Sequence, residues 1–161
     1  MHYWLIRFKL HYQQLEPVYN IIRLLTGHEG FRPAPEHSIH LTCISLENIP
    51  KTKENLVLAN SVVEYINNKI SGSGSGSVVG LELQFEGYKL FSTKGNRLVL
   101  AYNPPTELQR WVSDGLKMFG ITDRWEYHPH ITLGKLNSAD LSSIPTLPVM
   151  SPLRLTSVEL T

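Results

Sequence analysis

The chain has 161 residues, a formal net charge of +1 and a hydrophobic content of 42%. This length suits one domain with a substantial core, and we expect residues 1–161 to form a single domain. A nearly neutral chain lacks the marked positive charge of proteins that bind long duplex nucleic acid. A local basic pocket for a short anionic ligand remains compatible with this composition.

Two further features bear on the cellular environment. The only cysteine, Cys43, cannot form an internal disulfide, which favours a reducing compartment. No apolar run approaches the roughly 20 residues that a membrane-spanning helix needs, and the first ten residues indicate a strand rather than a signal peptide. We therefore expect a cytoplasmic protein without membrane contact, and a monomer.

The first half of the chain alternates strand-like and helix-like patterns. Aromatic and branched residues predict a strand at 3–10, and apolar residues at helical spacing predict helices at 13–26 and 52–69. Residues 30–36 hold two prolines and are expected to form a loop rather than regular structure. This loop leads into a strand at 38–46.

Residues 71–77 alternate strictly between serine and glycine. Such composition is typical of flexible linkers. We interpret the segment as a linker, either engineered or a natural flexible loop, and assign no function to it.

The second half of the chain is richer in strands. In order, we expect strands at 78–86, 88–92 and 97–102, a helix at 105–119, a strand at 129–135, an irregular segment at 136–150 and a final strand at 153–160.

Two of the predicted strands carry the same short motif. It is His40-Leu41-Thr42-Cys43 in the first and His130-Ile131-Thr132-Leu133 in the second. Side chains alternate between the faces of a strand, so each His shares a face with its Thr while the apolar residues face a core. Each motif also follows a strand, a helix and a loop in the same order. This repeat predicts two similar lobes, related by a pseudo-two-fold axis, with both motifs in the groove between them.

Two histidines in one groove suit acid–base chemistry near neutral pH. One neutral imidazole takes a proton from a hydroxyl or water, and the other, protonated, gives a proton to the leaving oxygen. Phosphodiester cleavage needs both steps, and two Thr hydroxyls can donate hydrogen bonds to the non-bridging phosphate oxygens. The scheme requires no metal. We therefore predict catalysis by His40 and His130 and phosphate binding by Thr42 and Thr132.

The paired motifs resemble those of the two-histidine phosphoesterase superfamily, which includes the LigT-like RNA 2′,3′-cyclic phosphodiesterases and 2′,5′-phosphodiesterases of host and viral origin. The segments Phe31-Arg32-Pro33 and Glu36-His37-Ser38-Ile39 are also similar to the lead-in of LigT-like members. The resemblance implies an α+β fold with two pseudo-symmetric lobes of antiparallel sheet, outer helices and a central cleft. It also implies metal-independent catalysis, without a cofactor.

The motifs do not choose the substrate within this superfamily. The near-neutral charge and the lead-in and exit of the second motif favour a short 2′-5′-linked oligonucleotide, of the oligoadenylate or cyclic dinucleotide type. If so, the resemblance implies a role in countering antiviral nucleotide signalling. One alternative is an RNA 2′,3′-cyclic phosphodiesterase. Another is a nucleotide- or RNA-binding module without catalysis.

Aromatic and basic residues near the motifs are candidates for base stacking and phosphate contact. They are Phe31, Arg32, Tyr88, Phe91, Trp125, Tyr127 and Lys135. For each, simple packing is the competing interpretation. His128 and His130 have the spacing of a metal pair, but Pro129 lies between them and no third ligand is evident, so we expect no metal site. Cys43 points away from the groove by strand parity and is not expected to act as a nucleophile.

Overall fold

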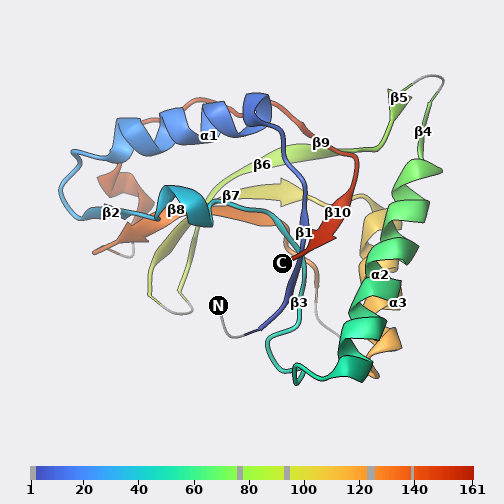
Figure 1. The fold of residues 1–161 in the computed structure, drawn as a ribbon. Coiled ribbons are helices and arrows are strands. Elements are labelled where there is room, and N and C mark those ends of the chain that lie inside the picture. The colour runs from blue at the N-terminus through green and yellow to red at the C-terminus, as the bar shows by residue number, and fades with distance from the viewer. Residues whose placement is uncertain (1–2, 76–77, 93–94, 123–125, 139) are drawn as a thin grey trace.

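The computed structural model describes residues 3–75, 78–92, 95–122, 126–138 and 140–161. Two antiparallel sheets, with helices packed against them, form its framework (Figure 1). The three-stranded sheet has the order β10-β1-β3, in which β1 spans Leu5–Phe8, β3 Thr42–Ser45 and β10 Val158–Leu160. Both pairings in this sheet are antiparallel.

The five-stranded sheet has the order β2-β8-β7-β6-β9. Its strands are β2 (Phe31–Pro33), β6 (Leu81–Phe91), β7 (Arg97–Asn103), β8 (His130–Leu136) and β9 (Leu153–Leu155). All of their pairings are antiparallel. The predicted α+β fold with two lobes of antiparallel sheet is confirmed.

Three helices cover the outer faces of the two sheets. Helix α1 (Tyr12–Leu25) follows β1 but packs against β2 and β8 of the other sheet. Helix α3 (Thr106–Met118) follows β7 and packs against β3, so α1 and α3 each cover the sheet that their preceding strand does not belong to. Helix α2 (Lys53–Ser71) packs against α3 and β10. This exchange ties the two lobes together. Short 3-10 helices occupy Glu36–Ser38 and Leu141–Ser143.

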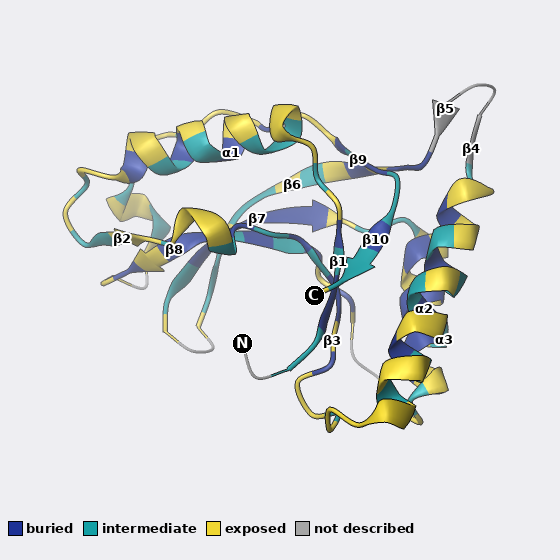
Figure 2. Cartoon of the chain, viewed as in Figure 1, coloured by how far each residue is buried: buried dark blue, intermediate teal, exposed yellow. Residues whose placement is uncertain are grey.

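The helices form where local sequence favours them. Their buried residues recur at spacings of three and four, as in Val18, Ile21 and Leu25 of α1, while the outward faces are exposed (Figure 2). Thr52 caps α2, since its hydroxyl accepts a hydrogen bond of 3.1 Å from the Asn55 amide. Among the described residues, none of the helices combines the length and apolar character that crossing a bilayer requires.

The strand predictions were wrong in four places. Residues 31–33 form β2 at the sheet edge, where Pro33 is tolerated because an edge strand need not donate on its outer side. The first motif strand begins only at Thr42. The predicted strands at 78–86 and 88–92 are mostly one strand, β6, bent by a register shift between Phe85 and Gly87.

The last predicted strand, 153–160, is two strands that belong to different sheets. In the serine–glycine segment, β4 (Gly74–Ser75) pairs with β5 (Val78–Val79). The helix predictions agree with α1, α2 and α3 to within two residues at each end.

Candidate active site

A single backbone bridge joins the two sheets at the centre of the two motifs. Leu41 pairs with Ile131 in the antiparallel sense, and both side chains are completely buried. In an antiparallel pairing, the residue before one member lies opposite the residue after the other. His40 therefore lies across from Thr132, and Thr42 across from His130. Each imidazole therefore has the hydroxyl of the opposite motif beside it, as the predicted pseudo-two-fold axis requires.

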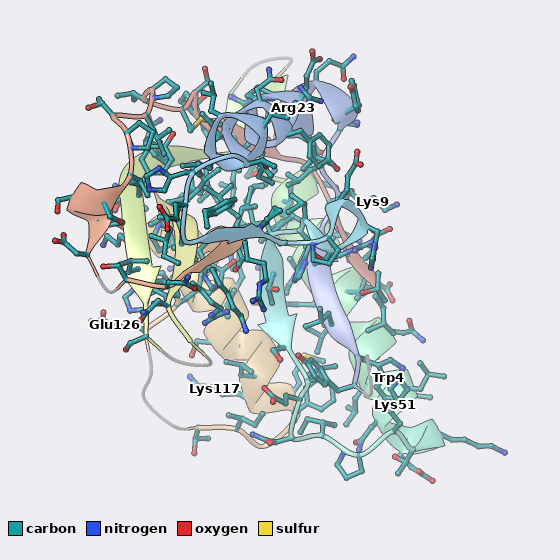
Figure 3. All side chains as sticks on the ribbon, turned by 90° about the vertical axis from the view of Figure 1, so that its left-hand side faces the viewer. Trp4, Lys9, Arg23, Lys51, Lys117 and Glu126 are labelled. Carbon is teal, nitrogen blue, oxygen red and sulfur yellow. The ribbon has the colours of Figure 1, made fainter. Side chains whose placement is uncertain are left out.

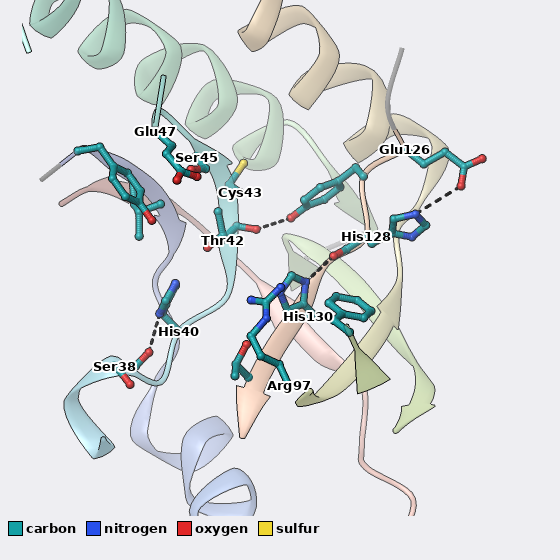
Figure 4. A pocket seen from close by; sticks show the side chains of 15 residues that line it. Ser38, His40, Thr42, Cys43, Ser45, Glu47, Arg97, Glu126, His128 and His130 are labelled. Atoms are coloured by element: carbon teal, nitrogen blue, oxygen red, sulfur yellow. Dashed lines mark hydrogen bonds and ion pairs between the residues drawn. The ribbon is translucent and has the colours of Figure 1, made fainter. Parts of the chain in front are cut away.

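Above this bridge the sheets separate and leave a cleft with a volume of about 530 Å³. Figure 4 shows His40 and His130 on its opposite sides, with Arg97 beside His130. The cleft is lined by residues from both lobes and from the segment before β8: Tyr3, Leu5, Ser38, His40, Thr42, Cys43, Ser45, Glu47, Phe91, Arg97, Glu126, Tyr127, His128, His130 and Thr132.

Both imidazoles are held by the same kind of hydrogen bond. Nδ1 of His40 lies 2.6 Å from the Ser38 carbonyl oxygen, and Nδ1 of His130 lies 2.8 Å from the His128 carbonyl oxygen. A carbonyl only accepts, so Nδ1 carries the proton in both rings and the neutral form has its lone pair on Nε2. No described residue is hydrogen-bonded to either Nε2 atom. Both are thus left for a bound molecule.

His130 has two neighbours in addition to the backbone hydrogen bond that both histidines make. The ring of Phe91 meets its imidazole edge-on at a centroid distance of 4.7 Å, and Arg97 lies beside it. Burial is the largest influence on the pKa of His130 and lowers it below its usual value. The hydrogen bond to the His128 carbonyl raises this pKa by less, and the positive charge of Arg97 has a still smaller lowering effect. The neutral form of His130 is therefore favoured.

The two threonine hydroxyls have no hydrogen-bond partner in the described part of the chain, and both residues are half-buried along the cleft. On the Thr42 side the backbone is fixed instead, because the hydroxyl of Tyr127 donates a 2.7 Å hydrogen bond to the Thr42 carbonyl. Tyr127 is buried, and burial raises the pKa of its hydroxyl. This bond closes one end of the cleft across the two lobes.

Cys43 lies beside Tyr127 and is also buried. Burial raises the pKa of its thiol, so the nucleophilic thiolate is strongly disfavoured. Among the described residues, no group of three or more His, Cys, Asp or Glu side chains is placed to hold a metal ion. His128 faces Glu126, with Nε2 at 3.5 Å from Oε2.

The remaining candidates from the sequence divide into two groups. Phe91 and Tyr127 line the cleft with the histidines. Tyr88 does not: its hydroxyl donates a 2.7 Å hydrogen bond to the Pro148 carbonyl. Nor does Phe31, whose ring covers Gly134. Trp125 lies outside the described residues.

Arg32 and Lys135 form a pair in register on β2 and β8, beyond the cleft. Arg97 lines the cleft, but sequence reasoning did not single it out. The sequence did offer a reason to expect Arg97 near the second motif. Arg97 is the first residue of the strand that precedes this motif in the repeat, and consecutive antiparallel strands tend to be neighbours. Tyr3 and Glu47 carried no such signal.

No protein-family model matches the sequence, and no curated protein is similar enough to count as a relative. Solved structures do match over nearly the whole chain. LigT of E. coli, without ligand, gives a TM-score of 0.66 at 16% identity, covering 99% of this chain and 86% of LigT. A protein described as a phosphoesterase gives 0.61 at 18% identity, covering 99% of this chain and 87% of that one.

A third match is the protein TT0787 of Thermus thermophilus, with a TM-score of 0.59 at 16% identity and coverage of 98% and 83%. The chain thus has the LigT-like fold of the two-histidine phosphoesterases, as its paired motifs predicted. At these identities the likeness establishes the fold, and the chemistry has to be argued from the residues of the cleft.

Proposed function

We propose that this protein is a metal-independent phosphodiesterase that cleaves 2′-5′ linkages of short oligonucleotides. The observation that carries the proposal is the matched pair of imidazoles in one cleft. Each is oriented through Nδ1 by a backbone carbonyl, and each leaves Nε2 for the substrate. A general acid and a general base on opposite sides of a bound phosphate are what phosphodiester cleavage needs.

The reaction assigns a different role to each histidine. Beside a 2′-5′ bond, the free 3′-hydroxyl attacks phosphorus while Nε2 of neutral His130 takes its proton. The bond from phosphorus to O5′ then breaks, and Nε2–H of His40 gives a proton to O5′. The products are a 2′,3′-cyclic phosphate and a 5′-hydroxyl. His130 is the base because its lowered pKa keeps it neutral near pH 7.

Thr42 and Thr132 complete the scheme. Each hydroxyl lies across from the histidine of the other motif, where it can donate to a non-bridging phosphate oxygen. Solved LigT complexes contain phosphate, ATP and 3′-AMP, which supports a small nucleotide as the ligand of this fold. Degradation of 2′-5′ oligoadenylates would remove a signal of antiviral defence, and this is the biological role that the proposal implies.

A second candidate is the opening of a 2′,3′-cyclic phosphate by water. The same residues serve it with the acid and base exchanged, and the resemblance of the paired motifs to LigT-like RNA 2′,3′-cyclic phosphodiesterases supports it. A third is nucleotide binding without turnover, since the same cleft accepts a phosphate whether or not it is cleaved.

One experiment separates these candidates. The protein is incubated in EDTA with 2′-5′ triadenylate, 3′-5′ triadenylate or 2′,3′-cyclic AMP, and the products are identified by mass spectrometry. We expect cleavage of the 2′-5′ compound alone, with a cyclic phosphate product. Loss of activity in EDTA contradicts the metal-free scheme. Cleavage of only the 3′-5′ compound contradicts the proposed specificity for 2′-5′ linkages. Opening of only the cyclic compound identifies the second candidate, and binding without turnover identifies the third.

A further inference from the structure

Three cations lie in register across three neighbouring strands of the five-stranded sheet. Lys135 on β8 is paired with Arg97 on β7 and with Arg32 on β2. Directly opposite residues of an antiparallel sheet project from the same face, so these side chains form one row. Like charges in direct opposition are destabilising. The opposition of Arg32 and Lys135 is therefore unfavourable in the free protein and is relieved by an anion that lies along these two side chains.

A bulge places Lys135 on this face. The register of β7 and β8 shifts so that Val99 pairs with Thr132 and Leu98 with Gly134, which leaves Leu133 as the extra residue. Without this extra residue, Lys135, five positions after His130, would point to the opposite face from the histidine. Bulges near active sites re-aim side chains in this way.

The row begins at the cleft. Arg97 lines the cleft together with Phe91, and its guanidinium carbon lies 5.8 Å from the Phe91 ring centroid. Figure 4 shows the Arg97 side chain reaching toward His130. Because of the bulge, the segment from His130 to Lys135 matches only the four steps from Ala101 to Arg97 on β7, so β8 advances about 13 Å. Lys135 and Arg32 are thus displaced from the reacting phosphate by the length of more than one nucleotide unit.

Elsewhere in the sheets, strand cations face acids. Arg7 is in register with Glu159 and bonds to it at 3.2 Å, and Arg154 is in register with Glu82 and bonds to it at 3.1 Å. By contrast, Arg32 and Lys135 are exposed and make no ion pair with any described residue. The side chain of Lys135 instead lies along Gly95, where a Cβ would be 3.8 Å from its Nζ.

We propose that Arg32 and Lys135, continued at the cleft by Arg97, form a second anion subsite that binds a phosphate of the substrate beyond the scissile one. This rests on the proposed function and names its substrate class: an oligonucleotide with several phosphates, or with a terminal polyphosphate. A cyclic mononucleotide has no group that reaches the subsite.

The test compares two substrates in the double variant Arg32→Gln/Lys135→Gln. For 5′-triphosphorylated 2′-5′ triadenylate, we expect KM to rise at least tenfold with kcat unchanged. For 2′-5′ diadenosine monophosphate, which holds only the scissile phosphate, KM stays the same. The slope of log(1/KM) against log salt for the longer substrate becomes shallower by about 0.7 for each phosphate–cation interaction that the variant removes. An equal change in KM for both substrates, or no change for either, overturns the subsite.

Three checks distinguish a folding defect from loss of the subsite. Lys117→Gln removes an exposed cation on α3, a helix that contributes nothing to the row (Figure 3), and should leave both KM values unchanged. The double variant should melt at or above the temperature of the unchanged protein, because it removes two mutually repelling charges. Lys135→Arg, which keeps the charge, retains a low KM for the longer substrate.

A binding measurement decides the subsite independently of catalysis. Inorganic tripolyphosphate is titrated into the unchanged protein and the double variant by calorimetry, and we expect binding at least tenfold weaker in the variant. Equal affinity refutes the subsite even if turnover is observed. If the unchanged protein cleaves neither substrate, the proposed function fails, and the tripolyphosphate titration still decides the subsite.

Discussion

The two halves of the cleft follow one plan and differ in their surroundings. In each half, the apolar residue after the histidine is fully buried and the ring is oriented by the carbonyl two residues earlier. His130, however, begins a strand with neighbours on both sides, while His40 precedes β3 and follows a 3-10 helix. His130 has the ring of Phe91 and the guanidinium of Arg97 beside it.

His40 instead borders a second groove of about 430 Å³, which is also lined by Arg7, Lys9, His11 and His37. One half thus places Phe91 and Arg97 beside its histidine, and the other leaves it at a junction of two grooves. The comparison teaches that the repeated motif supplies two candidate reacting groups in matched positions, while the unrepeated surroundings make the two histidines differ.

The largest expected effect is the loss of either histidine. A general acid or base contributes about 10²–10⁴-fold, so His40→Ala and His130→Ala should each lower kcat on 2′-5′ triadenylate by that factor. Steady-state kinetics with calorimetric binding measures this, and substrate affinity should persist. His37→Ala, in the exposed 3-10 helix before the first motif, is the matched control. Full turnover in either alanine variant would remove that histidine from the acid–base pair.

The second effect concerns the threonines. Removal of one donor to a developing oxyanion costs about 10²-fold in kcat, so we expect that loss for both Thr42→Val and Thr132→Val. Serine in place of either threonine keeps the hydroxyl and should keep most of the activity. If the losses in kcat of the two valine variants differ by more than tenfold, the two threonines do not contribute equally to phosphate binding, as the pseudo-symmetry predicts they should.

The third prediction compares a glycine in each lobe. A Cβ on Gly134 would lie 2.3 Å from the Arg32 carbonyl oxygen, which cannot move without separating β2 from β8. We expect Gly134→Ala to cost about 1–3 kcal/mol of unfolding free energy. At Gly115 the close atoms are Cδ1 of Ile44 and Cγ1 of Val62, both at 2.9 Å, and these are side-chain atoms, which shift by a few tenths of an ångström at less cost than a paired backbone.

Alanine also favours a helix over glycine by about 1 kcal/mol, so Gly115→Ala in α3 should leave stability within about 1 kcal/mol of the original. Thermal unfolding of the two variants measures the difference, at about 2–4 °C per kcal/mol. A larger loss of unfolding free energy in Gly115→Ala than in Gly134→Ala would contradict this account of how the two lobes are packed.

The smallest effect is on the pH profile. The base must be deprotonated, so kcat/KM rises with pH through the pKa of His130, which lies below its usual value. Arg97→Gln removes a charge that lowers this pKa. The acidic limb of the profile should therefore move to higher pH, by less than about one unit. A pH–rate profile of both proteins measures it, and an unchanged or lowered limb would show that Arg97 does not tune His130.

Much of the fold was predictable because its signals are local. The helices were placed to within two residues, since apolar spacing and caps act within a few turns. The failures involve partners that are distant in the chain. Pro33 fits a strand only because β2 is at an edge, and residues 153–160 divide between two sheets only because each sheet has a free edge to fill.

The sequence by itself singled out the candidate reacting groups. Strand parity and the repeated order around Thr42 and Thr132 were sufficient to pair each hydroxyl with a histidine, because alternation is a property of the backbone alone. Only the tertiary structure decided what surrounds them. The bridge between Leu41 and Ile131, the place of Arg97 beside His130 and the bulge that turns Lys135 all depend on register between strands that are far apart in the chain. Register arises from packing of whole sheets, which a local pattern does not encode.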